Sequence, residues 1–403
     1  MEKNVFKTLY CKLDSIRAIQ EHGSSSCSRF IGVKKEHFNP ESFGEGVEIF
    51  ILDIEFYLSY PFYAIHQNNP LRRVPPIYLA KYINSGYWLE ITYFENFDGE
   101  SHLYKGFISE SENGTLEQYE KISVDTIRPV EGFELKEFKE IRNIPNFELT
   151  EYIDSESNYE MVSFHVGQGM ATLIHNGETG YLIDAGAGTP IKRPTYSKLI
   201  QNDLLELTKK LKLTFFLSHS DSDHWRLLGW DPVIRNRIQA FIVPSRAKPI
   251  GFFDKTLKSK VYSISNHTRL TIATDTYLDV YRTNPKKPNN NNDGVVVYFE
   301  KLGKKALIAG DCVYSALYED LNPDLKNLVS FEYEAVVVPH HGDAASANIV
   351  PTAATISAKA FFSAGNHAYY RHPRNESLIE HEYRGYKVIC NKYPSGIIAV
   401  LMY

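Results

Sequence analysis

The segment LTFFLSHSDSDH, residues 213–224, constrains the fold more than any other part of the chain. A run that is typical of a buried strand ends directly before His219, Asp221, Asp223 and His224, so four potential metal ligands follow one strand. Zinc and manganese are bound in proteins by imidazole and carboxylate groups of this kind. Taken alone, the pattern also fits a solvated polar loop, so ligands elsewhere in the chain decide between the two interpretations.

Two further strand-like segments end in residues of the same kind. Asp311 follows the segment ALIAG, and His340 and His341 follow the segment AVVVP. A site for two metal ions needs ligands that several loops bring together at one edge of the scaffold. The three strand ends together therefore predict a metal centre at the edge of a mixed α/β fold.

Seven ordered motifs resemble one family. They are HVGQGMA (165–171), IDAGAG (183–188), HSDSDH (219–224), NNDGVVV (291–297), AGDC (309–312), PHHGD (339–343) and SAGNHAYYRHP (363–373). In this order they resemble the metallo-β-lactamase superfamily and, within it, the hydrolase domain of the competence protein ComEC. The resemblance covers residues 159–403 and implies an αββα sandwich.

The resemblance also implies two divalent metal ions, zinc or manganese. Their expected ligands are His219, Asp221, Asp223, His224, Asp311, His340 and His341, with His219 and Asp221 on one ion, Asp223 and His224 on the other, Asp311 between them, and one of the two adjacent histidines completing the shell. A hydroxide between the ions is then the nucleophile, because two cations acidify bound water. The expected reaction is hydrolysis of a phosphodiester, as in a phosphodiesterase or nuclease.

Two residues are expected to act around the metals. His372 matches the late His-Pro element and is a candidate to donate a proton or hydrogen bond to the leaving group, so Asp223 and His372 are the expected catalytic residues. Asp184 is expected to support the metal loop as an outer hydrogen-bond acceptor.

The chain also departs from the family pattern. His165 and Met170 stand where the family has acids, and His165 is more simply a packing residue than a ligand. Trp225 and Arg226 follow the metal loop, where they could reshape access for a substrate.

Several further polar residues have a structural interpretation as well as a functional one. His267 could be an additional ligand but lies in a segment that reads as a surface turn. The run from Asn289 to Asn292 reads as a loop, although Asn292 or Asp293 could line the cavity. Lys286 and Lys287, with Arg282, could contact phosphates, whereas small charge groups are usually solvated surface.

The length of 403 residues predicts two structural units. Strand-like segments at 46–55 and 87–95 and turn-rich sequence between them indicate a β-rich N-terminal domain over residues 1–150, of unknown role. An acidic, loop-like stretch at 149–160 is the predicted linker, and residues 159–403 form the predicted hydrolase domain.

Composition limits the partners. The formal charge of -5 gives no global basic field, so a nucleic-acid or nucleotide substrate would have to be held by a local patch or by the metals. The four cysteines are scattered, as in reduced cytosolic proteins, and no apolar run is long enough for a membrane helix. We expect a cytoplasmic protein that does not bind membranes, with a protein partner for the N-terminal domain as one option.

Three functions remain open at this point. The favoured one is metal-dependent phosphodiester hydrolysis. Hydrolysis of another ester, a lactone or an amide is the alternative within catalysis, because one fold carries many chemistries. Outside catalysis, the metals would be structural and the chain would be a binding protein.

Overall fold

The computed structural model describes residues 5–38, 47–55, 62–63, 73–74, 88–112, 119–130, 158–245, 250–273, 275–365, 370–390 and 397–402. Contacts within the chain divide it into two units, residues 1–143 with 248–259, and residues 144–247 with 260–403. The predicted linker at 149–160 lies almost wholly outside the described residues, so the predicted boundary stays a prediction.

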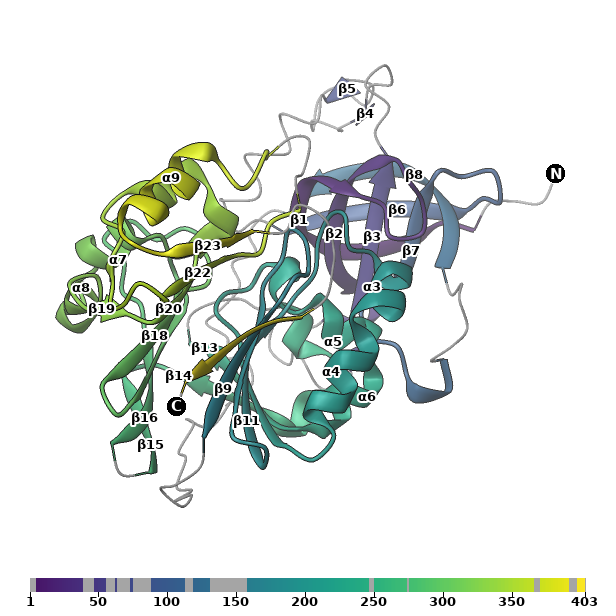
Figure 1. The fold of residues 1–403 in the computed structure, drawn as a ribbon. Coiled ribbons are helices and arrows are strands. Elements are labelled where there is room, and N and C mark those ends of the chain that lie inside the picture. Colours follow the sequence, from purple (N-terminus) through teal and green to yellow (C-terminus); the bar gives the residue numbers. More distant parts are fainter. Residues whose placement is uncertain are drawn as a thin grey trace. The chain divides into compact units, whose positions relative to one another are not determined.

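The first unit contains a closed antiparallel barrel with the strand order β1-β2-β3-β7-β8-β6 (Figure 1). The strands are β1 (Lys7–Ile19), β2 (Ser26–Lys34), β3 (Phe50–Glu55), β6 (Leu89–Glu95), β7 (Ser101–Lys105) and β8 (Tyr119–Pro129). Its apolar core includes Leu9, Phe30 and Leu52, and a buried ion pair joins Arg29 to Asp53 at 2.7 Å. Closure leaves no edge strand unpaired, which stabilises a small β unit.

Short elements complete this unit. They are η1 (Lys35–His37), β4 (Phe62–Tyr63), β5 (Arg73–Val74), η2 (Glu110–Glu112) and η4 (Ile250–Phe253), and η5 (Lys258–Lys260) leads back into the second unit. The segment 250–259 is attached to the barrel unit by the Asp254 carboxylate, which accepts a hydrogen bond from the Ile49 amide at 3.0 Å.

The second unit contains two seven-stranded sheets. The first has the order β14-β13-β12-β11-β10-β9-β24, and the second has the order β15-β16-β17-β18-β20-β22-β23. The first sheet consists of β9 (Tyr159–Phe164), β10 (Ala171–His175), β11 (Thr179–Ala185), β12 (Lys212–Phe216), β13 (Ile238–Pro244), β14 (Val261–Ile264) and β24 (Ile397–Met402). The second consists of β15 (Thr268–Ala273), β16 (Thr276–Arg282), β17 (Val295–Lys301), β18 (Lys304–Ile308), β20 (Ala335–Val337), β22 (Lys359–Phe362) and β23 (Lys387–Cys390).

The two sheets share one core. Ile183 and Phe216 of the first sheet and Val297 and Ile308 of the second lie in a single cluster of buried apolar residues. On β17, alternate side chains turn the other way: Val296 and Tyr298 pack outward in a second cluster. This period of two is what a strand needs when both of its faces are covered.

Helices cover the outer faces of both sheets (Figure 1). Those connecting the strands of the first sheet are α3 (Arg193–Leu199), α4 (Gln201–Thr208), α5 (Arg226–Trp230) and α6 (Pro232–Arg237). On the second sheet they are α7 (Tyr314–Glu319), α8 (Pro323–Leu328) and α9 (Asn375–Tyr383), with the short pair β19 (Glu332–Tyr333) and β21 (Thr352–Ala353) beside them. The predicted αββα sandwich with an additional β-rich N-terminal unit is confirmed.

The state of the cysteines and the search for membrane-spanning helices can be reported together. All four cysteines are free thiols, and three of them are buried. Within the described part of the chain, no helix combines the length and the hydropathy that crossing a bilayer requires.

Candidate metal centre

The candidate metal ligands follow strands of both sheets. The β12 strand leads to His219 and to the short helix η3 (Ser222–His224), while β18 leads to Asp311 and β20 leads to the short helix η6 (Pro339–Gly342). In each case the first of these residues comes three positions after the end of a buried strand, whose pairing in the sheet fixes where the chain leaves it. The three strand ends that the sequence singled out are therefore brought to one place.

Two overlapping groups of side chains converge there. The ligand atoms of His219, His224 and Asp311 lie within 4.8 Å of one another, and so do those of Asp223, His224 and His341. Asp311 Oδ1 lies 3.2 Å from His224 Nε2 and 3.6 Å from His341 Nε2. Its second oxygen, Oδ2, lies 3.7 Å from His219 Nε2. The Asp311 carboxylate thus faces histidines on two sides, the position that a bridging ligand needs.

The convergent atoms have no other hydrogen-bond partner. His219 Nε2, His224 Nε2, His341 Nε2 and Asp311 Oδ1 are all buried and unpaired. A buried polar atom without a partner costs about 1–3 kcal/mol, so four of them facing one point need an explanation. A divalent cation among them would satisfy all four, and nitrogen and carboxylate donors are the set that zinc or manganese takes. The residues therefore fit the metals that the sequence implied.

A second layer holds two of these imidazoles in the required tautomer. His224 Nδ1 donates to Asp184 Oδ2 at 2.7 Å, and His341 Nδ1 donates to the Ser363 carbonyl at 3.0 Å. Each ring is left with an Nε2 lone pair that faces the cluster. Ser218 fixes Asp184 in turn, because its amide and its hydroxyl each donate to one carboxylate oxygen at 2.7 Å. Asp184 thus lies where an outer support of the metal loop is expected.

Asp221 and His340 lie at the rim of the cluster. Asp221 Oδ2 is 3.6 Å from His219 Nε2, and its side chain keeps 29% of its exposure. His340 keeps 28%, and both of its ring nitrogens have partners: Nδ1 is 3.2 Å from Asp343 Oδ2, and Nε2 is 3.0 Å from the Asn291 side-chain amide. Adjacent in sequence, His340 and His341 therefore have different surroundings, and only His341 offers a buried, unpaired nitrogen.

The loops around the cluster are held in an unusual backbone conformation. His340, His341 and Gly342 have consecutive φ values of 50°, 55° and 74°, and Asp184 has a φ of 56°. Non-glycine residues pay for such angles, typically about 1–3 kcal/mol each, and they gather at functional sites. These backbone angles give the adjacent His340 and His341 side chains different surroundings.

Glycine allows the metal loop to pass close to its neighbours. A Cβ atom at Gly186 would lie 1.5 Å from the Asp223 carbonyl oxygen, and one at Gly169 would lie 2.7 Å from the same oxygen. Met170, beside Gly169, donates its amide to that carbonyl at 3.2 Å. The glycines of the GQG and DAGAG segments therefore act by permitting backbone contact with the residue that carries Asp223.

The cluster's own charges favour cations. Burial opposes ionisation of Asp311, but His341, His224, His340 and His219 together hold the pKa of its carboxyl well below the usual value. Burial also disfavours protonated His224, yet Asp184 and Asp311 outweigh it and raise the pKa of this imidazole. The same balance, with Asp311 and Asp343 as the acids, raises the pKa of His340 to about 9. A field that stabilises buried imidazolium also stabilises a divalent cation at the same point.

His372 lies beside the cluster. Its ring centroid is 5.6 Å from that of His340 and 6.2 Å from that of His341. Burial and these two histidines lower the pKa of His372 to about 3. The Gln168 amide donates to His372 Nδ1 at 3.0 Å, which leaves the ring proton on Nε2. His372 is therefore a neutral hydrogen-bond donor next to the candidate ligands.

The other histidines and the arginine considered from the sequence have varied surroundings. His165 is buried, burial lowers its pKa to about 4, and neither of its ring nitrogens has a hydrogen-bond partner. His267 binds Asp279 at 2.7 Å and stacks on Tyr281. Arg282 is buried and donates to the Ser245 carbonyl and to Asp293.

One expectation about the site needs correction. Trp225 and Arg226 are 0% and 6% exposed, so they are packed in the interior instead of shaping access to the metal loop. The asparagine run forms the loop that its sequence predicts: Asn292 bonds to the Lys287 carbonyl and Asp293 pairs with Arg282, while Asn291 contacts His340 at the rim of the site.

Sequence reasoning assigned no role to several supporting residues: Gln168, Ser218, Ser363 and Asp343. Gln168 could have been proposed from the sequence, because it is the polar side chain between two glycines in the motif HVGQGMA. The serines and Asp343 could not, since their partners lie far away in the sequence or depend on backbone angles. His367 and Tyr369 lie outside the described residues.

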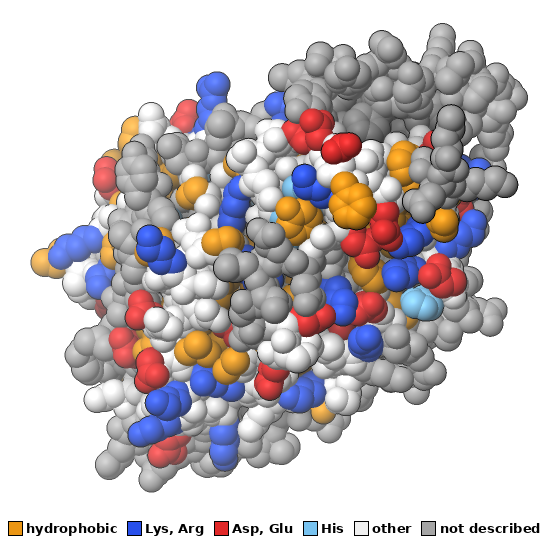
Figure 2. Space-filling view, turned by 90° about the vertical axis from the view of Figure 1, so that its right-hand side faces the viewer, with side chains coloured by type: hydrophobic (Ala, Val, Ile, Leu, Met, Phe, Trp, Pro, Cys, Tyr) orange, Lys and Arg blue, Asp and Glu red, His pale blue; other side chains and the backbone are white. Residues whose placement is uncertain are grey.

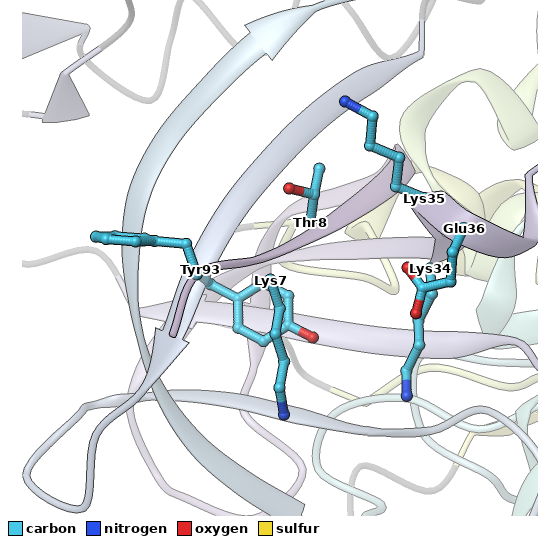
Figure 3. Close-up of a pocket in the computed structure, with 7 residues that line it drawn as sticks. Lys7, Thr8, Lys34, Lys35, Glu36 and Tyr93 are labelled. Atoms are coloured by element: carbon cyan, nitrogen blue, oxygen red, sulfur yellow. The ribbon is translucent and has the colours of Figure 1, made fainter. Parts of the chain in front are cut away.

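A separate cavity of about 450 Å³ lies in the barrel unit and is lined by Phe6, Lys7, Thr8, Lys34, Lys35, Glu36 and Tyr93 (Figure 3). Its charges are largely balanced: Lys7 pairs with Glu95, and Lys35 pairs with Glu90 at 3.1 Å. Figure 2 shows acidic and basic side chains interspersed over the face turned to the viewer. The barrel cavity therefore has no strong preference for an anion, and the chemistry-bearing groups lie in the second unit.

No protein-family model matches the sequence, and no curated protein matches it either. Several solved structures are similar to it. The metallo-beta-lactamase fold protein YhfI from Bacillus subtilis is 12% identical, covers 61% of this chain and 100% of its own, and gives a TM-score of 0.39. Zn(2+)-bound PqqB from Methylobacterium extorquens is 12% identical, with coverages of 60% and 99% and a TM-score of 0.35.

The metallo-beta-lactamase MIM-2 is 14% identical, with coverages of 48% and 77% and a TM-score of 0.28. YhfI and MIM-2 bear the name of the superfamily that the motifs predict. At these identities and scores the likenesses carry no inference about substrate, and the narrower resemblance to the competence protein's hydrolase domain stays a prediction.

Proposed function

We propose that the chain is a metal-dependent hydrolase whose substrate is a phosphodiester. One observation carries the proposal: four buried and otherwise unpaired atoms, from His219, His224, His341 and Asp311, face one another at the ends of strands from two sheets. A protein that used these residues only for packing would gain by replacing them with apolar side chains, because unpaired buried polar groups are costly.

Two divalent ions, zinc or manganese, fit the donor set. His219, Asp221 and His224 would serve one ion, Asp223 and His341 the other, with Asp311 shared between them. When bound, such ions lower the pKa of water to near neutrality and neutralise the developing charge on a phosphoryl oxygen. The support of His224 by Asp184 and of His341 by Ser363 keeps the ligand nitrogens aimed before any ion arrives.

His341 is the better ligand of the adjacent pair. Its Nε2 is buried and unpaired, and it lies 3.4 Å from Asp223 Oδ2. His340 is more exposed, and its nitrogens already contact Asn291 and Asp343. We assign His340 to the substrate-facing rim.

His372 is suited to assist the leaving group. Because Gln168 donates to Nδ1, the proton on Nε2 is available to a substrate oxygen. The ring is nearly buried, and its neighbours His340 and His341 bring it to the side of the metal cluster. His372 would donate a hydrogen bond from Nε2 to the leaving oxygen as its bond breaks and would keep the proton, because the neutral ring is a very weak acid.

The experiment is a turnover assay with bis-p-nitrophenyl phosphate and a single-stranded oligonucleotide, in the presence of manganese or zinc. We expect hydrolysis of both by the purified chain and a loss of at least 100-fold in kcat in Asp311→Ala. Asp203→Ala is the matched control, since it removes an exposed aspartate in the first turn of α4. Equal rates in Asp311→Ala and the control would contradict the proposal.

The same assay separates the alternatives. Turnover of p-nitrophenyl esters, lactones or amides but not of diesters would favour a different metallo-hydrolase. Bound metal with no turnover of any substrate, together with a partner captured by residues 1–150, would favour the binding protein. The role of the barrel and the cytoplasmic location remain predictions of the sequence.

A further inference from the structure

Ser218 is a buried serine directly before His219, and it lies where three strands of the second unit meet. It follows β12, and its carbonyl accepts a hydrogen bond at 2.6 Å from the amide of Val295, the first residue of β17. On a third side, a Cβ atom at Gly310, which follows β18 and precedes Asp311, would lie 2.4 Å from the Ser218 hydroxyl oxygen. Since Ser218 is 3% exposed, water does not compete for this hydroxyl.

The hydroxyl oxygen of Ser218 contacts three polar groups. It lies 2.7 Å from Asp184 Oδ2 and 3.1 Å from the Nδ1 atoms of both His219 and His224. Asp184 also accepts hydrogen bonds from the Ser218 amide and from His224 Nδ1, both at 2.7 Å, so it acts as an acceptor toward each of these groups. A serine hydroxyl has one proton and two lone pairs. Its proton therefore points to Asp184, and its lone pairs are left for imidazole N–H groups.

This geometry determines which nitrogen of His219 carries the proton. Its Nδ1 faces a hydroxyl oxygen whose own proton is engaged, so Nδ1 is the donor and Nε2 keeps a lone pair. His219 Nε2 is buried, has no hydrogen-bond partner and lies 3.7 Å from Asp311 Oδ2. The Ser218 hydroxyl thus aims the His219 lone pair at the cluster before an ion is bound.

The other two imidazoles have outer partners of a different kind. The Asp184 carboxylate holds His224 and the Ser363 carbonyl holds His341, and both partners remain when the Ser218 hydroxyl is removed. Asp184 also keeps its bond from the amide of residue 218, because alanine has the same amide. His219 is therefore the imidazole that loses its acceptor.

We propose that Ser218 is the positioning residue for His219. The ion that His219 binds then depends on this hydroxyl, whereas the ion at Asp223 and His341 does not. His219 and His341 lie in different groups of candidate ligands, so each can report on its own ion. This inference rests on the proposed function only in assuming that ions bind at the cluster. A serine needed merely for packing gives a different result, because its truncation weakens both ion sites or neither.

The first test needs neither bound metal nor a substrate. Ring 15N shifts of the metal-free chain should show His219 with its proton on Nδ1, and in Ser218→Ala they should move toward a mixture of the two tautomers. His341 is the internal reference and should keep its shifts. Ser220→Ala is the matched control, because it removes a hydroxyl two residues away while the carbonyl of residue 220 still accepts from Trp225 Nε1. A proton on His219 Nε2 in the parent chain, or unchanged His219 shifts in Ser218→Ala, would overturn the proposal.

The second test measures zinc binding at each histidine separately. Zinc is added in competition with a chelator of known affinity, and the ring shifts of His219 and His341 report the occupancy of their own ion sites. In Ser218→Ala the affinity measured at His219 should fall at least roughly tenfold, the usual effect of losing an outer partner of a ligand. The affinity measured at His341 should match that of the Ser220→Ala control. Equal losses at both histidines, or no loss at His219, would overturn the proposal.

The two tests keep this proposal distinct from the proposed function. A chain that shows the expected His219 tautomer and zinc affinities but hydrolyses no phosphodiester contradicts only the hydrolase. Hydrolysis of phosphodiesters with the same His219 tautomer and zinc affinity in Ser218→Ala as in the parent contradicts only the role of Ser218.

Discussion

Replacing Gly186 by alanine should disable the metal centre without touching a ligand. The added Cβ would lie 1.5 Å from the Asp223 carbonyl oxygen and 2.7 Å from the His224 Cα. Ordinary contacts of this kind begin at 3.4 Å, so the backbone between Asp223 and His224 has to move outward. Neither neighbour is a flexible side chain that could turn aside.

The required movement is far larger than a metal site tolerates, because ligand distances are held to within about 0.2 Å. The displaced segment carries Asp223 and His224, and His224 belongs to both ligand groups. We therefore expect the affinity for zinc or manganese to fall by at least about 10-fold, because loss of a single outer hydrogen-bond partner of a ligand already costs roughly 10- to 100-fold. Competition with a chromophoric chelator would measure it, and circular dichroism would show that the fold persists.

Gly177→Ala is the matched control for this substitution. Gly177 has a φ of +91°, so alanine is strained there, but nothing lies within 4 Å of the added Cβ. The control should lose roughly 1–2 kcal/mol of stability from its backbone conformation and keep its metal affinity. If Gly186→Ala binds metal as tightly as Gly177→Ala, the close approach of the glycine loop to Asp223 is not what positions the site.

Three further predictions follow from the same contacts. His341→Ala should lose bound metal while His340→Ala keeps it and changes KM, and equal metal contents in elemental analysis would contradict this division. Gln168→Leu should let the His372 proton move between the ring nitrogens, seen as changed 15N shifts, and lower kcat more than KM; unchanged shifts would refute it. Burial lowers the pKa of His381 to about 4, so between pH 6.5 and 4 the unfolded chain binds an extra proton. The free energy of unfolding should fall over that range by up to about 3 kcal/mol, less so in His381→Gln, as urea titrations would show.

The metal centre could be predicted from the sequence because its ligands follow strands. A buried strand has a recognisable composition, and its end fixes where the next side chains lie, so Asp311 could be assigned to the same edge as His219 from far along the chain. The sandwich could be expected because the seven ordered motifs resemble the metallo-β-lactamase superfamily, and not from the strand pattern itself. Closure of the N-terminal barrel could not be predicted, since it depends on the pairing of β1 with β6, strands about eighty residues apart.

The sequence could not show which of His340 and His341 is the better candidate metal ligand. Both follow the same strand, and their roles separate only because consecutive positive φ angles rotate one ring inward and leave the other at the rim. The burial of Trp225 could not be predicted from the sequence for a related reason. A tryptophan after a metal loop can face either the substrate or the core, and packing in the interior decides the matter.

The most direct test of the account is the metal content of the intact chain. Protein stripped with a chelator, reloaded with zinc or manganese and freed of excess metal should hold close to two equivalents by mass spectrometry of the elements. The Asp311→Ala variant should hold fewer, because this carboxylate lies between the two groups of histidines. A folded chain that binds no metal, or a variant that retains both equivalents, would contradict the central claim.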